Sequence, residues 1–258
     1  MKQYIIDAFT DKIFSGNPAA VCITEYPLTE DLMLNIAKEN NLSETAFALK
    51  AEDGYNLRWF TPGGEIDFCG HATLATAFVI SEFIHKQYSE IIFHTKSGDF
   101  PVSIKYENIE MNFPAYSLNE ISVTDEMQKA IGVKPVQAFI DRDMMLVLEN
   151  EEQIRNLNPN FDKIKLLDGL GLCVTAKGKI FDCVSRFFAP KLNVNEDPVT
   201  GSTHCMIIPY WAERLGKNSI NAYQASNRGG KIYGFLQDNR VIISGNAVLF
   251  GISDICLL

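Results

Sequence analysis

Two glycine-led turns carry most of the residue types in this chain that could do chemistry. The first reads Cys69-Gly70-His71-Ala72-Thr73, and the second reads Asp197-Pro198-Val199-Thr200-Gly201-Ser202. Each turn precedes an apolar run that predicts a buried helix. A helix that begins after glycine presents unpaired backbone N–H groups and a partial positive charge, so it can hold a carboxylate or an oxyanion. The two turns therefore predict a site for a small anionic molecule.

The second turn lies in a half of the chain that repeats the first half. Four segments return at offsets of 130, 128, 131 and 132 residues, which one alignment with short loop insertions would produce. The matched pairs are Ala8-Phe9-Thr10-Asp11 with Ala138-Phe139-Ile140-Asp141, Arg58-Trp59-Phe60-Thr61-Pro62 with Arg186-Phe187-Phe188-Ala189-Pro190, Gly70-His71-Ala72-Thr73 with Gly201-Ser202-Thr203-His204, and Gly98-Asp99-Phe100 with Gly230-Lys231-Ile232. We therefore expect two equivalent units with a cleft between them.

Length and charge limit the class of protein. The 258 residues suit one large domain or two of about 130 residues, and the repeat favours two. The net charge is −9, from 23 Lys and Arg against 32 Asp and Glu, and the sequence contains no basic run. Electrostatic attraction to nucleic acid or to anionic lipid is therefore not expected.

The N-terminus, the apolar runs and the cysteines predict a cytoplasmic location. The first nine residues read as a short strand and lack the pattern of a signal peptide. The longest apolar stretch, residues 74–80, is too short to span a bilayer. The six cysteines are scattered and form no C-x-x-C pair, which favours free thiols over disulfides.

Apolar alternation and β-branched runs predict that each half is mostly strand. Strands are expected near residues 2–9, 19–24, 43–50, 55–60, 90–95, 99–105, 108–113, 136–140, 144–149, 170–176, 180–188, 220–225, 231–236 and 240–244. Thr29 can cap a helix over 30–39, and residues 71–84 and 202–215 predict two enclosed helices. Pro209 should kink the last of these helices or end its first segment.

These elements predict an α+β fold of two pseudo-symmetric units, each a mostly antiparallel sheet or barrel wrapped round a central helix. The expected N-terminal unit covers residues 1–116 and is completed by 246–258, and the expected C-terminal unit covers 117–245.

Several motifs taken together resemble the phenazine-biosynthesis PhzF-like family. They run from residue 7 to about residue 202 and read Asp7-Ala8-Phe9-Thr10, Phe14-Ser15-Gly16-Asn17-Pro18-Ala19-Ala20-Val21, Leu42-Ser43-Glu44-Thr45-Ala46-Phe47, Cys69-Gly70-His71-Ala72-Thr73 and Asp197-Pro198-Val199-Thr200-Gly201-Ser202. The resemblance implies the diaminopimelate-epimerase fold and a cofactor-independent isomerisation, in which a proton leaves one carbon of a small carboxylate and returns at another. It also implies a homodimer.

The resemblance implies roles for individual residues. Glu44 matches the family's acid/base glutamate. In this sequence it lies in a strand beside apolar neighbours, a setting that would raise a carboxyl pKa toward neutrality. His71 and Asp197 match the other polar catalytic positions. Substrate-binding contacts are expected from Asn17, Cys69, Gly70, Gly201 and Ser202.

Three alternatives remain open at this point. Related racemases and epimerases use one cysteine from each half, and here only Cys69 is present, so such an enzyme would need another partner. A metal site is not expected, because Cys69, His71, His204 and Cys205 lack the usual ligand spacing. A non-catalytic binding protein could retain the same cleft.

Overall fold

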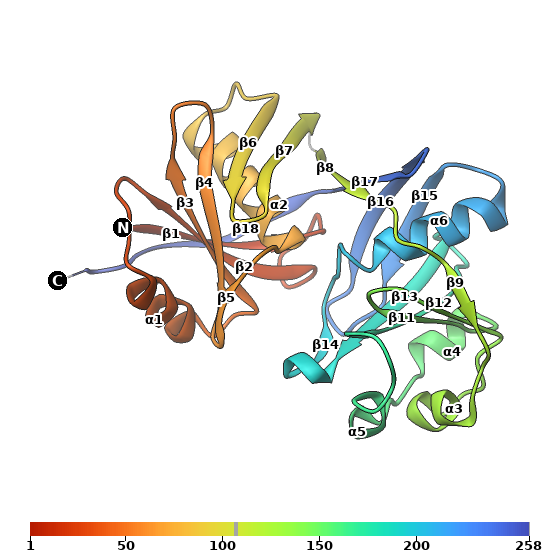
Figure 1. Ribbon diagram of the computed structural model, residues 1–258. Helices are drawn as coiled ribbons and strands as arrows, with labels where there is room; N and C mark the ends of the chain where they lie inside the picture. Colours follow the sequence, from red (N-terminus) through yellow and green to blue (C-terminus); the bar gives the residue numbers. More distant parts are fainter. Residues whose placement is uncertain (106–107, 258) are drawn as a thin grey trace. The chain divides into compact units, whose positions relative to one another are not determined.

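The computed structural model describes residues 1–105 and 108–257, and within it the chain forms two compact units (Figure 1). The N-terminal unit comprises residues 1–112 and the segment from 244 onward, and the C-terminal unit comprises residues 113–243. The boundaries expected from the sequence lie within four residues of these, and the last residue of the expected segment 246–258 lies outside the described residues.

Strands dominate both units, so the α+β class predicted from the sequence is correct. The strands that begin in the N-terminal unit's two segments are β1 (Lys2–Ala8), β2 (Asn17–Thr24), β3 (Glu44–Lys50), β4 (Tyr55–Thr61), β5 (Gly64–Ile66), β6 (Glu90–Thr95), β7 (Gly98–Lys105), β8 (Asn108–Pro114) and β18 (Ala247–Asp254). Those that begin in the C-terminal unit are β9 (Asn119–Ile121), β10 (Gln137–Ile140), β11 (Met144–Val147), β12 (Leu172–Lys177), β13 (Cys183–Ala189), β14 (Val194–Asp197), β15 (Ser219–Gln224), β16 (Gly230–Gln237) and β17 (Arg240–Gly245).

Helices are fewer than strands in the described residues and connect them. They are α1 (Glu30–Asn40), α2 (Gly70–Val79), the π-helical turn η1 (Ile80–Ile84), α3 (Asp125–Ile131), α4 (Glu151–Arg155), α5 (Phe161–Ile164), the 3-10 turn η2 (Pro190–Leu192) and α6 (His204–Leu215). Among the described residues, no helix is both long enough and apolar enough to cross a membrane.

The two units use the same order of strand pairings. In the N-terminal unit, β1 and β2 are antiparallel, β2 and β3 parallel, β3 and β4 antiparallel, β4 and β6 parallel, and β6 and β7 antiparallel. In the C-terminal unit the same sequence of pairings runs through β10, β11, β12, β13, β15 and β16. An added antiparallel strand completes each set, β18 beside β1 and β9 beside β10.

A buried helix follows the equivalent strand in each of the two units. Helix α2 follows β5, and its residues from His71 to Ala77 are all buried against β1, β2, β3, β7 and β18. Helix α6 follows β14 and packs against β15 and β16. The expectation of one enclosed helix in each half is confirmed, although the first helix widens into the π-helical turn η1 after Val79.

The sequence predicts that Pro209 kinks the second helix or ends its first segment, and the helix does not end there. Helix α6 continues through it to Leu215. Proline lacks the N–H that would bond to the carbonyl four residues earlier, which belongs to Cys205. The backbone N–H of Tyr116 donates to that carbonyl instead, at 2.9 Å. The C-terminal unit thereby satisfies the acceptor that the proline leaves open.

Candidate active site

Three elements of the N-terminal unit begin close to one another and place the candidate acid/base residues. Glu44 is the first residue of β3, and Asn17 is the first residue of β2, its parallel neighbour. His71 lies in the first turn of α2, which packs on both strands. Because parallel strands bring equivalent ends to one edge of a sheet, the start of α2 meets both side chains there.

His71 is the centre of this cluster. Its Nε2 lies 3.0 Å from Oε2 of Glu44, and its Nδ1 lies 3.2 Å from the amide nitrogen of Asn17. The Sγ of Cys69 is 3.5 Å from Nδ1. His71 and Asn17 are buried, while the side chain of Glu44 keeps 16% of its exposure. Glu44 therefore faces an imidazole rather than the apolar surroundings expected from the sequence.

The backbone at the start of α2 is held by its own residues. Thr73 bonds the Cys69 carbonyl twice, from its backbone N–H at 3.0 Å and from its hydroxyl at 2.6 Å. The side chain of Cys69 does not cap the helix, and the N–H of Ala72 points at its sulfur. The first turn is therefore rigid, and its positive end lies beside Glu44.

Burial and charge set the protonation of this cluster. Burial raises the pKa of the Cys69 thiol, the negative charge of Glu44 raises it further, and His71 opposes that rise. Burial alone would lower the pKa of His71, but the Glu44 carboxylate at 3.0 Å favours the charged ring and holds that pKa above its usual value. His71 therefore holds its second proton strongly, and Cys69 rests as a thiol.

The C-terminal unit holds the other predicted catalytic residue in a hydrogen-bonded loop. Asp197 ends β14, and its carboxylate accepts a bond of 2.5 Å from the hydroxyl of Thr200. Gln224, fully buried at the end of β15, accepts from the N–H of Thr200 at 2.9 Å and donates to the carbonyl of Asp197 at 2.7 Å. Sequence reasoning did not assign this role to Gln224, although its position in step with Ile220 and Ala222 on the apolar face of the strand was a signal.

The second glycine-led turn differs from its prediction. Helix α6 begins at His204, three residues after Gly201, and the residues between form tight turns with bonds from His204 to Gly201 and from Cys205 to Ser202. His204 donates from Nδ1 to the carbonyl of Thr200 at 2.8 Å, and burial lowers its pKa to about 4. His204 therefore closes the turn as a neutral ring.

The cysteines are free thiols, as predicted. Of the four residues weighed as metal ligands, Cys69 and His71 share the cluster at α2. Cys205 is buried within α6, and burial raises the pKa of its thiol to about 12. Glu44 joins Cys69 and His71, and one ligand atom from each of the three lies within 4.8 Å of the others.

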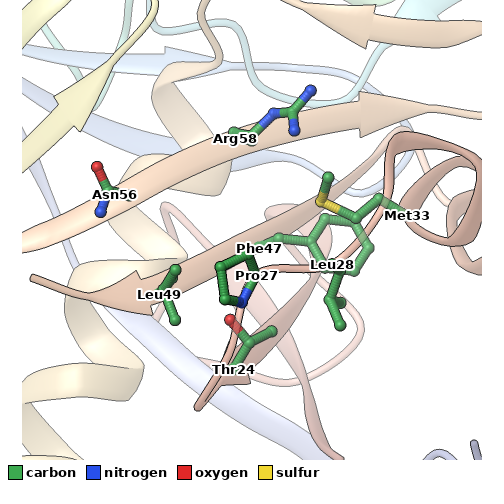
Figure 2. Close-up of a pocket in the computed structure, with 8 residues that line it drawn as sticks. All are labelled: Thr24, Pro27, Leu28, Met33, Phe47, Leu49, Asn56 and Arg58. Carbon is green, nitrogen blue, oxygen red and sulfur yellow. The ribbon is translucent and has the colours of Figure 1, made fainter.

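A hollow of about 90 Å³ lies elsewhere on the N-terminal unit (Figure 2). Its lining is mainly apolar and comprises Thr24, Pro27, Leu28, Met33, Phe47, Leu49, Asn56 and Arg58. The guanidinium of Arg58 is held by Glu65 and Glu30. Leu49 stands five residues along β3 from Glu44, a separation of about 17 Å in an extended strand. The hollow therefore does not contain the acid/base cluster.

Comparison with known proteins identifies the family. The model of the family described as phenazine biosynthesis-like protein matches residues 6–251. A protein of Halalkalibacterium halodurans named an uncharacterized isomerase is 44% identical over 250 residues, which cover 95% of this chain and 94% of that protein. A crystal structure of a PhzF-family phenazine biosynthesis protein from Enterococcus faecalis is 47% identical, covers 99% of each chain and superposes with a TM-score of 0.98.

More distant structures show the fold alone. A probable proline racemase from Agrobacterium radiobacter is 9% identical, with a TM-score of 0.63 over 99% of this chain and 93% of that chain. The diaminopimelate-epimerase-like fold expected from the sequence is therefore correct. With a family match across nearly its whole length and a relative at 44% identity, the chain belongs to the phenazine biosynthesis-like protein family.

Proposed function

We propose that this protein is an isomerase that moves a proton between two carbons of a small cyclic or unsaturated carboxylic acid by general acid/base catalysis, without a cofactor. The family and the relatives named isomerases support the reaction class. The observation that carries the proposal is the 3.0 Å contact between the Glu44 carboxylate and the His71 imidazole at the start of a buried helix.

Glu44 is the proton carrier. Its carboxylate takes a proton from one carbon of the substrate, and the electron pair of that C–H bond moves into the adjacent unsaturated system. The carboxyl group so formed returns the proton to another carbon, which restores the catalyst. Because most of its side chain is buried, few water molecules compete for the proton.

His71 and the first turn of α2 supply positive charge where negative charge develops. A protonated His71 stabilises the Glu44 carboxylate before transfer and the delocalised anion after it. The N–H groups of Gly70 and His71 stand at the start of helix α2, before the first carbonyl that a helical N–H can reach, so they suit a substrate carboxylate. Asn17 orients the imidazole from its other nitrogen.

Asp197, Gly201 and Ser202 are proposed as the contribution of the C-terminal unit. The carboxylate of Asp197 would bond a polar group of the substrate, and the turn at Gly201 and Ser202 would bind the substrate carboxylate. The hydrogen bonds from Thr200 and Gln224 support this assignment, because they fix the carboxylate and the backbone of Asp197.

The test is proton NMR in D₂O with a panel of small carboxylates that includes dihydro-hydroxyanthranilate. The parent protein should incorporate deuterium or isomerise at least one acid. Glu44→Gln should lose that activity by at least about a thousandfold, within the range that acid/base groups contribute, while its fold is unchanged. Glu30→Gln makes the same change at an exposed carboxylate of the same unit and should be fully active.

Two outcomes would contradict the proposal. Turnover of Glu44→Gln at the parent rate would remove Glu44 from the chemistry. Ligand binding without any exchange across the panel would favour a non-catalytic binding protein. Free proline and other amino acids belong in the panel, because exchange at their α-carbon would favour a racemase with Cys69 as one base.

We also propose a location and an assembly state. A cytoplasmic homodimer agrees with the acidic composition, the free thiols and the family resemblance. Light scattering of the purified chain should give about twice the mass of 28.9 kDa, and a monomeric mass would contradict it.

A further inference from the structure

We propose that two arginine–glutamate ion pairs, one in each unit, position the glycine-led turns that carry the proposed catalytic residues. In the N-terminal unit, Nε and Nη2 of Arg58 donate to the two carboxylate oxygens of Glu65 at 2.6 and 2.7 Å. In the C-terminal unit, Nε and Nη2 of Arg186 donate to those of Glu196 at 2.7 and 2.9 Å. The consequence for catalysis rests on the proposed function, whereas the positioning itself does not.

The two ion pairs occupy equivalent positions in the two units. Arg58 and Arg186 begin matched segments of the sequence repeat, and Glu65 and Glu196 each lie five residues before the glycine of their turn. Each guanidinium also lies over the ring of the phenylalanine two residues further along its own strand, with 5.3 Å and 5.0 Å between the guanidinium carbon and the ring centre. The two units therefore hold the arginine, and through it the glutamate, in the same way.

Stability alone does not explain why both units carry this arrangement. The side chains of Arg186 and Glu196 keep only 12% and 18% of their exposure, and those of Arg58 and Glu65 keep 28% and 13%. The desolvation of a largely buried pair offsets most of the attraction between its charges, and apolar replacements of such pairs are often as stable. Two parallel N–H···O bonds do, however, fix the distance and the angle between the strands that carry them. The feature that the two units share is therefore geometric.

In the N-terminal unit the ion pair holds the strand that enters the first turn. Glu65 lies in β5, and three residues separate the end of β5 from the start of α2. Lys96 bonds the same carboxylate, and Glu30 bonds the guanidinium of Arg58 from the start of α1. Arg58, in β4, thereby sets where β5 ends, and with it the position of His71 in the first turn of α2.

In the C-terminal unit the ion pair holds the strand that ends at the second turn. Glu196 directly precedes Asp197, the last residue of β14. The side chain of Glu196 bonds Arg186 while that of Asp197 bonds Thr200, as expected of neighbouring strand residues that point to opposite faces. Arg186 is fixed in turn by the carbonyl of Leu157, to which its Nη1 donates at 2.9 Å. Glu196 is therefore a positioning residue that holds the backbone of Asp197.

The first test needs no substrate. Glu65→Gln and Glu196→Gln keep the size of the side chain but leave one acceptor oxygen for two N–H donors, so each variant breaks one of the two parallel bonds. Glu196→Gln should speed hydrogen exchange of the Thr200 N–H by about tenfold or more, a factor that the loss of one bond to a charged group allows. Glu65→Gln should shift and broaden the NMR signal of the His71 ring nitrogen that faces Glu44.

Two controls break ion pairs that lead to neither turn. Glu151→Gln removes the 2.7 Å pair with Arg155 in α4, where the glutamate side chain keeps 11% of its exposure. Glu110→Gln removes the 2.8 Å pair between β8 and Lys105 of β7. Both controls should leave the two NMR readouts unchanged, even where they lower the unfolding free energy.

Kinetics separate positioning from a purely structural role. On an acid that the parent protein isomerises, Glu65→Gln should lower kcat about 10–100-fold with little change in KM, because a small misplacement of a reacting group costs that much. Glu196→Gln should instead raise KM, since Asp197 is assigned to a polar group of the substrate. Arg186→Lys keeps the charge but cannot form two parallel bonds, so it should behave like Glu196→Gln.

Unchanged exchange at Thr200 and an unchanged His71 signal in the respective variants would overturn the proposal. Equal changes in the two controls would also overturn it, because the ion pairs would then act through stability alone, and so would parental kcat and KM on an acid that is turned over. If no acid is turned over, the proposed reaction fails, and the NMR readouts still decide whether the pairs position the turns. Circular dichroism monitors the fold, and Arg186→Lys replaces Glu196→Gln if that variant is poorly folded.

Discussion

Replacing Gln224 by methionine should destabilise the C-terminal unit and disturb Asp197. The amide of Gln224 is fully buried and joins two backbone groups of one loop, the N–H of Thr200 at 2.9 Å and the carbonyl of Asp197 at 2.7 Å. Methionine has a similar volume and fills the same space, but it can neither accept from the first group nor donate to the second.

The cost can be estimated from those two bonds. A buried polar group left without a partner costs about 1–3 kcal/mol, so the two groups together set a range of about 2–6 kcal/mol. Asp197 is only half-buried, and water can reach part of its backbone, which places the expected loss at about 2–4 kcal/mol. The carboxylate of Asp197 should also lose its fixed position, because the Thr200 residue that bonds it would no longer be held by Gln224.

The assay is urea unfolding followed by circular dichroism, together with amide hydrogen exchange at Thr200. Gln224→Met should lower the unfolding free energy by the stated amount and speed exchange of the Thr200 N–H. Gln128→Leu, an apolar replacement on the exposed face of α3, is the control and should change stability by less than about 0.5 kcal/mol. If Gln224→Met unfolds like the parent and Thr200 stays protected, the hydrogen-bonded loop does not hold Asp197.

Two further predictions concern the N-terminal unit. The hydrogen bond to Asp99 raises the pKa of His94. The stability that this pair contributes is therefore present below the unfolded pKa of about 6.5 and is lost as the pH rises through the folded pKa. Thermal unfolding between pH 5 and 9 should show this loss of stability, and His94→Gln should remove the pH dependence. The second prediction concerns Gly16, which has a φ of +68°, and a Cβ added there would lie 2.1 Å from the carbonyl oxygen of Ala8. Gly132, in the C-terminal unit, also has a positive φ, +77°, but a Cβ added there would meet no atom within 4 Å. Gly16→Ala should therefore cost clearly more than the roughly 1 kcal/mol of Gly132→Ala in chemical unfolding, and equal costs would show that the loop relaxes around the new Cβ.

The sequence was most informative where structure is local and regular. Alternation located the long strands other than β18 to within a few residues, and Thr29 was recognised as the cap of α1, where its side chain accepts from the N–H of Leu32. The short strands β5, β9 and β14 and the short helices α3, α4 and α5 were missed, because three to seven residues contain too few turns of a periodic pattern to stand out. The eight-residue strand β18 was also missed, and half of its residues are exposed rather than alternating with buried ones.

The chemistry of the cluster depends on distances that no sequence spacing encodes. The metal-ligand argument compared cysteines and histidines near the two helix starts and left out Glu44, which lies 25 residues before Cys69. The parallel pairing of β2 with β3 and the packing of α2 on both strands bring these residues together. The continuation of α6 through Pro209 also depends on a contact distant in sequence, because the N–H that satisfies the open carbonyl belongs to Tyr116, 93 residues earlier in the chain.

The two units share one order of strand pairings, yet only one of them can carry the proton-transferring carboxylate. Strand register makes Gly171 the counterpart of Glu44, since Thr45 pairs with Phe60 and Leu172 pairs with Phe188. A side chain at Gly171 has no room, because a Cβ there would lie 2.3 Å from the ring of Phe187.

The cysteine of the glycine-led turn is likewise present in one unit only, as Cys69. The glycine-led turns align Cys69 with Thr200, whose hydroxyl is already bonded to the carboxylate of Asp197. A mechanism with a matched base from each unit would need a second thiolate or a second glutamate at these positions, and the C-terminal unit offers neither. A single carboxylate that removes a proton and returns it to another carbon needs no such partner. The asymmetry between Glu44 and Gly171 therefore favours proton transfer by one base.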